Sequence, residues 1–95
     1  MNCIPESYSA YKRSAVFTES SVPKGLLKDH SVAEHCYAKI IVLEGEIEYT
    51  LSGESSSSTT LTPENPGTIK PLVKHYINPL GKTRFYVEFY REERI

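Results

Sequence analysis

The chain has 95 residues, a formal net charge of −1 and 24% charged residues. A chain of this length can build one hydrophobic core, so we expect a single domain over residues 1–95 that buries only about 60 to 65% of its unfolded surface. The charges are mixed in sign, and the longest apolar run, residues 40–43, is far below the roughly 20 residues of a membrane span. Neither a nucleic acid nor a membrane is therefore expected as a partner.

The N-terminus, MNCIPESYS, lacks the charged-then-apolar order of a secretion signal, so we expect a cytoplasmic protein. The chain has two cysteines, Cys3 and Cys36. Because a reducing cytosol disfavours disulfides, both are expected to be free thiols.

Seven tyrosines, three phenylalanines, six prolines and five glycines are typical of an all-β chain with many turns. The first predicted strand covers residues 11–18, and SSVPKG at residues 20–25 ends it. Residues 25–29 are predicted to be extended again, and residues 30–34 to be a polar connection.

Residues 36–43 form the strongest predicted strand, and its apolar side chains on both faces indicate a central position in the sheet. A turn is predicted at residues 44–46, around Gly45. From Ile47 to Leu51, apolar residues alternate with polar ones, which predicts a strand with one face in the core. Residues 52–60, SGESSSSTT, have no apolar residue and are predicted to be a mobile hairpin loop.

The last third of the chain holds three predicted strands. Prolines and a glycine at residues 61–67 predict a turn, and residues 68–71 a short strand that its proline ends. Residues 75–77 are a further short strand, a turn at residues 78–81 follows, and residues 83–91 form the last strand. Seven or eight short strands in so few residues favour a small barrel or sandwich.

Six short motifs in order carry a resemblance to a known family: KRSAVF at 12–17, DH at 29–30, VLEG at 42–45, PGTIKP at 66–71, His75, and FYVEFYR at 85–91. The chain resembles the small cupin-like TehB/YeaR-like domain found at the N-terminus of tellurite-resistance protein B. The resemblance implies an all-β, compact cupin-like double-stranded β-helix barrel (jelly roll) and a cytoplasmic role in the response to tellurite or another oxyanion. In some relatives the domain precedes a methyltransferase that uses S-adenosylmethionine, and no fingerprint for that cofactor is found in this sequence.

The resemblance also implies where a cupin metal site would lie. Such a site usually takes two histidines and a glutamate from the first motif and one histidine from the second. Here His75 is the second-motif histidine, but the first-motif positions hold Val32, Glu34 and Ala38. The full metal motif is therefore absent.

The three histidines allow three interpretations. In the first, they are plain surface or hydrogen-bonded residues. In the second, His30 and His75 bind Zn²⁺, Ni²⁺ or Fe²⁺ with a third group, which is His35, Glu34 or a water. In the third, His75 acts as an acid or base without a metal. His35 is the least secure ligand, because His30 and His35 are five residues apart and point to opposite faces of a strand. The pocket walls are expected to include Tyr37, Tyr49 and Ile77.

Two functions stay open. One is a binding or sensing domain that holds a small molecule, an oxyanion or a metal in its barrel. The other is a small metal-dependent enzyme of the dioxygenase or isomerase kind, which the incomplete first motif disfavours. A two-fold homodimer is expected, because Tyr86 and Tyr90 lie on the polar side of the last strand. Glu88, on the same side, is expected to pair with Arg84 or Arg91 at the surface.

Overall fold

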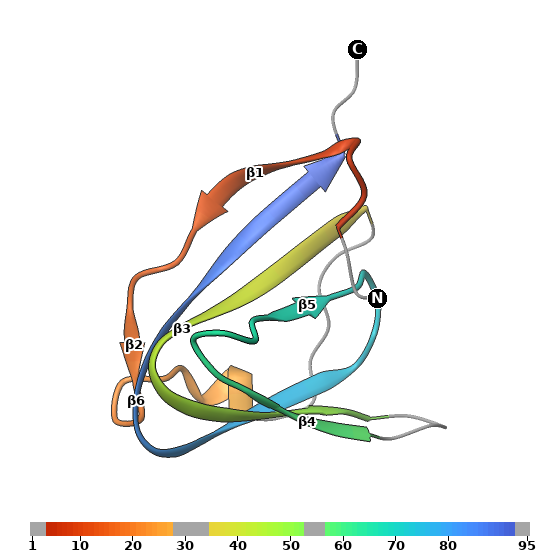
Figure 1. The fold of residues 1–95 in the computed structure, drawn as a ribbon. Helices are drawn as coiled ribbons and strands as arrows, with labels where there is room; N and C mark the ends of the chain where they lie inside the picture. Colours follow the sequence, from red (N-terminus) through yellow and green to blue (C-terminus); the bar gives the residue numbers. More distant parts are fainter. Residues whose placement is uncertain (1–3, 28–34, 53–56, 93–95) are drawn as a thin grey trace.

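The computed structural model describes residues 4–27, 35–52 and 57–92. In order along the chain its elements are β1 (Tyr8–Arg13), β2 (Phe17–Thr18), the short 3-10 helix η1 (Lys24–Leu27), β3 (Cys36–Leu51), β4 (Ser57–Leu61), β5 (Gly67–Ile69) and β6 (His75–Glu92) (Figure 1). The six strands belong to one antiparallel sheet, which confirms the all-β prediction. In the part of the chain that is described, no helix is long and apolar enough to cross a membrane.

The two longest strands, β3 and β6, form the backbone of the fold. They pair from Cys36 with Arg91 at one end to Leu51 with His75 at the other. The other strands extend this pair in the order β1-β6-β3-β4, while β2 also pairs with β6 and β5 with β3. Strand β3 therefore has neighbours on both edges, as its two apolar faces predicted.

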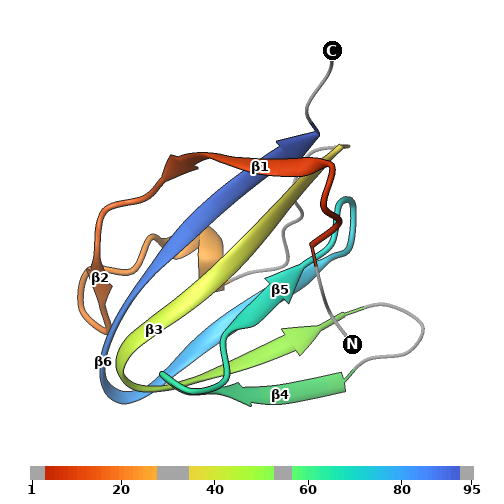
Figure 2. The same cartoon turned by 45° about the horizontal axis from the view of Figure 1, so that its top comes forward.

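Both long strands bend sharply at the same end of the molecule, so the sheet folds over on itself (Figure 2). The bends lie at Gly45 and Gly81, whose φ angles are 84° and 82°. The predicted turns at these two glycines are wrong, because each strand continues through its glycine. The pairing of β3 with β6 shifts register between Val42 and Glu46, so the glycines bend the strands as bulges do instead of reversing them.

Three other boundaries differ from the predictions. The strand predicted at 11–18 is interrupted between β1 and β2, although Ser14 still donates its N–H to the Val87 carbonyl at 2.8 Å. The described part of the predicted extended segment 25–29 is helix η1. Residues 57–60 belong to β4, where the Thr50 and Ser58 hydroxyls share a hydrogen bond of 3.0 Å. Cross-strand bonds of this kind hold a polar sequence in a sheet without apolar residues.

The core fills the inner side of the folded sheet. Its buried members are Ala38, Ile40, Val42, Ile47, Tyr49, Leu61, Ile69, Ile77, Phe85 and Val87. Alternate residues of β3 face the other way, and Leu43 is 43% exposed. Phe17, Val22 and Leu26 pack against the core from the N-terminal segment, which thereby covers part of the inner side.

Candidate functional site

A cavity of about 430 Å³ opens on the inner side of the folded sheet. Its walls come from the β1–η1 segment and from strands β3, β5 and β6, and the residues that line it are Ser14, Phe17, Pro23, Gly25, Leu26, Ala38, Ile40, Ile69, His75, Ile77, Val87 and Phe89. Only two of these, Ser14 and His75, have polar side chains, and none of the described lining residues is Asp, Glu, Lys or Arg. The described walls are therefore suited to apolar groups.

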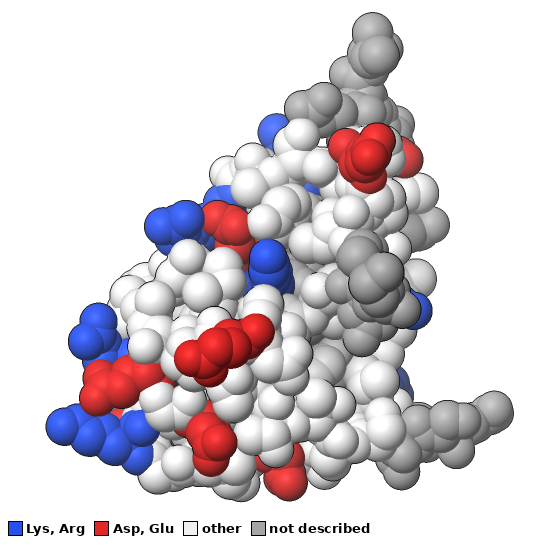
Figure 3. Space-filling model, in the orientation of Figure 1, with Lys and Arg blue, Asp and Glu red and all other residues white. Residues whose placement is uncertain are grey.

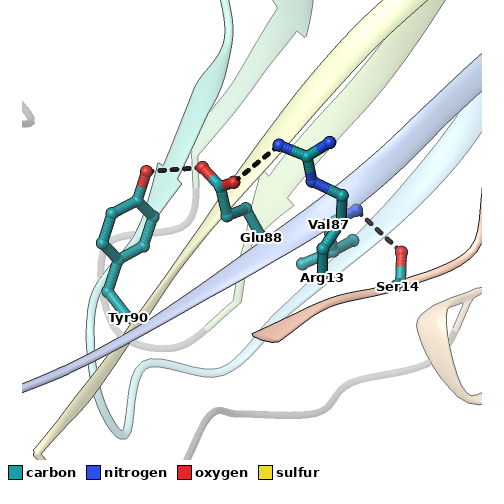
Figure 4. A network of polar contacts seen from close by, with 5 residues as sticks. All are labelled: Arg13, Ser14, Val87, Glu88 and Tyr90. Atoms are coloured by element: carbon teal, nitrogen blue, oxygen red, sulfur yellow. Dashed lines mark hydrogen bonds and ion pairs between the residues drawn. The ribbon is translucent and has the colours of Figure 1, made fainter. Parts of the chain in front are cut away.

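The hydroxyl of Ser14 is already engaged by the fold. It accepts a hydrogen bond from the Val87 N–H at 2.9 Å (Figure 4) and donates one to the Ala15 carbonyl at 2.8 Å. These bonds fix the place where the chain leaves β1 and begins the cavity wall. Ser14 thus has a structural task, and His75 is the other polar side chain of the described lining.

His75 is the first residue of β6 and is completely buried. Its Nδ1 lies 2.9 Å from the Val73 carbonyl oxygen, and since a carbonyl only accepts, Nδ1 carries the proton. In the neutral ring the lone pair is then on Nε2. The ring also meets that of Tyr49 edge-on, with 5.7 Å between centroids.

The turn before His75 is strained in a way that fixes its direction. Leu72 has a φ of 60° and is 63% exposed, a left-handed conformation that a leucine rarely adopts. The adjoining backbone is tied down, because Ser52 donates its N–H to the Lys74 carbonyl at 3.0 Å. Strain of about 1–3 kcal/mol persists only where the surroundings enforce it, and here they enforce the entry of His75 into the core.

The structure distributes the predicted site residues unevenly. His75 and Ile77 both line the cavity, and Tyr49 touches the His75 ring without belonging to the lining. Burial raises the pKa of Tyr49 to about 12, so this phenol is neutral at physiological pH. Tyr37 lies on the other face of β3, where its ring packs edge-on against Tyr8 at 4.8 Å, and it does not contribute to the cavity.

The other two predicted ligands are not brought to the cavity within the described residues. His35 is exposed just before β3, has a φ of 64°, and is not part of the cavity lining. His30 and its possible partner Glu34 lie outside the described residues, as does Cys3. Cys36 is a free, half-buried thiol. In the described ranges no group of three or more His, Cys, Asp or Glu side chains could hold a metal ion.

Sequence reasoning missed the N-terminal wall of the cavity, which consists of Ser14, Phe17, Pro23, Gly25 and Leu26. A signal for it was present. The inner side of a central strand must be covered, and Phe17, Val22 and Leu26 are apolar residues of a segment otherwise rich in polar and turn-forming residues. Local sequence patterns do not show which segment covers a given sheet, because the contact joins residues that are far apart in the sequence.

A polar network occupies the opposite face of the sheet (Figure 4). Glu88 of β6 accepts hydrogen bonds from the Tyr90 hydroxyl at 2.6 Å and from Arg13 Nη2 at 3.0 Å. The Tyr90 hydroxyl, followed by Arg13, lowers the pKa of Glu88, and the same bond to the carboxylate raises the pKa of Tyr90 to about 12. The network ties β1 to β6 on the face away from the cavity.

The predicted ion pair of Glu88 is thereby corrected. Its partner is Arg13, the residue directly opposite on β1, rather than Arg84 or Arg91. Directly opposed side chains are close neighbours, whereas Arg84 is four residues away along the strand and Arg91 alternates onto the other face. Arg84 Nη1 stands instead 3.7 Å from Glu44 Oε2.

Comparison with solved structures supports the same fold. TehB from Haemophilus influenzae aligns with a TM-score of 0.85 at 21% identity over 92% of this chain and 32% of its own length. A protein from E. coli strain K12 aligns with a TM-score of 0.88 at 18% identity over 99% of this chain and 100% of its own. The chain thus spans about a third of TehB, and at these identities the likeness shows the fold alone. No curated protein matches the chain.

The family comparison is more specific. The model of the TehB-like domain matches residues 12–87, which include both long strands up to Val87 and the whole cavity wall except Phe89. The match begins inside β1 and covers most of the chain. This chain therefore belongs to the TehB-like domain family.

Proposed function

We propose that this chain is a binding domain that holds a small molecule in the cavity beside His75. The observation that carries the proposal is the cavity itself, about 430 Å³ within a chain of 95 residues. Ligand sites in proteins are clefts or cavities that typically measure about 300–1,000 Å³. A space of this size, with one buried imidazole among apolar walls, has the composition of a binding site.

The lining favours a largely apolar ligand over a bare oxyanion. An oxyanion that enters the cavity loses its hydration, and this loss needs compensation by cations or by several N–H donors. Neither Lys nor Arg is among the lining residues in the described ranges 4–27, 35–52 and 57–92. A role in the tellurite or oxyanion response remains part of the proposal, with tellurite as one of the molecules to be tested.

A ligand screen by NMR on the wild-type chain tests this function, with three variants as comparisons. Ala38→Leu fills the cavity from β3, His75→Gln removes the imidazole, and His35→Gln is the matched histidine control at an exposed position. Circular dichroism establishes that each variant is folded.

A ligand of the cavity loses at least about tenfold in affinity in Ala38→Leu, a loss of about 1.4 kcal/mol, and keeps its affinity in His35→Gln. Binding that all three variants retain, or a screen without any bound molecule, contradicts the proposal.

A metal site at His75 is a second candidate, and the tautomer of His75 favours it. With Nδ1 bonded to the Val73 carbonyl, Nε2 carries the lone pair of the neutral ring, the tautomer in which an imidazole binds Zn²⁺, Ni²⁺ or Fe²⁺ through Nε2. Further ligands would have to come from outside the described residues, where His30 and Glu34 lie. Such a centre is also what the dioxygenase or isomerase alternative requires.

Metal analysis of the purified protein separates these candidates. Stoichiometric metal that is lost in His75→Ala and kept in His35→Ala supports the metal site, and stoichiometric iron with that behaviour supports the enzyme. Protein without stoichiometric metal, even after incubation with each ion, removes both and leaves the small-molecule proposal. We also propose that the chain acts in the cytoplasm and as a homodimer.

A further inference from the structure

A lysine and an arginine lie on the same face of the sheet as Phe89, which lines the cavity. Phe89 is the last lining residue on β6, and strand alternation puts Arg91 on the same face, two residues further on. Lys12 of β1 is paired with Phe89 and so shares that face, and its Nζ stands 5.5 Å from the centroid of the Phe89 ring. Lys12 and Arg91 are hereafter the rim cations.

Within the described residues, the rim cations form no ion pair. Over residues 4–27, 35–52 and 57–92, neither has a carboxylate at ion-pair distance. The Arg91 guanidinium lies over the Tyr11 ring, 4.7 Å from its centroid. The nearby acidic residues of β6, Glu88 and Glu92, alternate onto the opposite face, where Glu88 is bound to Arg13 and Tyr90.

Elsewhere the surface charge is mixed. On the face drawn in Figure 3, Lys and Arg side chains are interspersed with Asp and Glu, without a large area of one sign. The formal net charge of the chain is −1, so long-range attraction of an anion by the whole molecule is not expected, and the pair of cations beside the cavity decides which charge is favoured there.

We propose, on the basis of the binding function above, that the ligand is an amphipathic monocarboxylate whose apolar part fills the cavity and whose carboxylate lies against Lys12 and Arg91. Each half of such a molecule meets its complement. The tail is removed from water by walls whose described residues are mostly apolar, and the carboxylate keeps part of its hydration at an exposed position beside two cations. A bare oxyanion lacks the first contribution and a hydrocarbon lacks the second.

The test is calorimetric titration with hexanoate and octanoate and with the matching alcohols, hexanol and octanol. The affinity is expected to rise about fourfold for each added methylene, because the burial of one methylene contributes about 0.8 kcal/mol to the free energy of binding. Octanoate is expected to bind about two- to fivefold more tightly than octanol, the range of exposed ion pairs. This advantage shrinks as the salt concentration rises.

Two variants assign the preference to the rim cations. In the double variant Lys12→Gln, Arg91→Gln the octanoate advantage over octanol is lost, while octanol binds as in the wild type. Lys82→Gln, which removes an exposed lysine at the Gly81 bend, is the matched control and keeps the advantage. Ala38→Leu weakens both ligands, which shows that they enter the cavity and do not adsorb to the surface.

The outcomes separate this inference from the proposed function. If octanol binds and octanoate binds no better, or if the double variant keeps the preference, the monocarboxylate inference is wrong while the cavity remains a binding site. If neither the carboxylates nor the alcohols bind, but another molecule binds the wild type and loses affinity in Ala38→Leu, the monocarboxylate inference is wrong and the proposed binding function stands. If nothing binds in a manner that depends on the cavity, both fail.

Discussion

The bend at Gly45 provides a sharp test of the fold, because a second glycine serves as its control. A Cβ at Gly45 would overlap the Lys82 carbonyl oxygen and lie 2.8 Å from Thr83 Cγ2, whereas a Cβ at Gly81 would meet nothing within 4 Å. Both residues have positive φ angles, 84° and 82°. An alanine at either position therefore has the same backbone strain, but only Gly45→Ala also forces β3 and β6 apart.

The magnitudes follow from these two contributions. The left-handed conformation costs an L-residue roughly 1–2 kcal/mol, which is the whole expected loss for Gly81→Ala. Overpacking adds about 1–3 kcal/mol, so Gly45→Ala is expected to lose about 2–5 kcal/mol in total. Since a domain of this size is stabilised by about 5–14 kcal/mol, the loss at Gly45 is a large share of the whole.

Urea unfolding followed by circular dichroism measures both variants against the wild type. The free energies of unfolding of Gly45→Ala and Gly81→Ala are expected to differ by about 1–3 kcal/mol, while the slope of the free energy against urea concentration stays that of the wild type. If Gly45→Ala is no less stable than Gly81→Ala, the close approach of β3 to Thr83 is refuted, and with it the account of the bend given above.

Three further predictions concern charge and assembly. Glu19 accepts a hydrogen bond from the Thr83 N–H at 3.0 Å, which lowers the pKa of Glu19 in the folded protein. The ionised Glu19 therefore stabilises the fold above the unfolded pKa of about 4.3, and this stabilisation is lost as the pH falls through the lower folded pKa. In Glu19→Gln, the urea midpoint should consequently fall less steeply with decreasing pH than in the wild type. The hydrogen bond to Glu88 raises the pKa of Tyr90 to about 12, so the protonated phenol stabilises the fold below about pH 10, and this stabilisation is lost as the pH rises through about 12. In Glu88→Gln, the tyrosinate absorbance of Tyr90 should appear at lower pH. An unchanged titration would contradict the hydrogen bond. Light scattering at tens of micromolar (about the range in which weak dimers persist) should give the mass of two chains for the wild type. The variant Tyr86→Lys, on the outer face of the sheet, should give the mass of one chain. A monomeric wild type would contradict the proposed homodimer.

Much of the sheet was predictable from the sequence, because alternation is a local signal. The two apolar faces of residues 36–43 predicted a central strand, and alternation from Ile47 to Leu51 predicted a second strand with one buried face; the structure joins the two in β3. The bends were not predictable from the same residues. A glycine with positive φ between two apolar runs is needed equally by a hairpin turn and by a bulge, and only the pairing of β3 with β6 distinguishes them.

The site was harder to predict because its residues are distant in the sequence. His75 was recognised from its motif, but its orientation depends on Leu72, whose positive φ contradicts the usual preference of leucine. Tyr37 was assigned to the pocket because it is an aromatic residue in a central strand, and the face of that strand was chosen wrongly. The inner face is instead that of Ala38 and Ile40, which line the cavity.

The two glycines and the histidine belong to one geometric arrangement. His75 and Phe89 lie near opposite ends of β6, yet both line the same cavity, which a straight strand would not allow at about 3.3 Å per residue. The bend at Gly81 returns the second half of β6 toward the first, and the bend at Gly45 keeps β3 paired with both halves (Figure 2). The glycines therefore shape the cavity as well as the sheet, and they explain why one buried histidine can face residues so distant along its own strand.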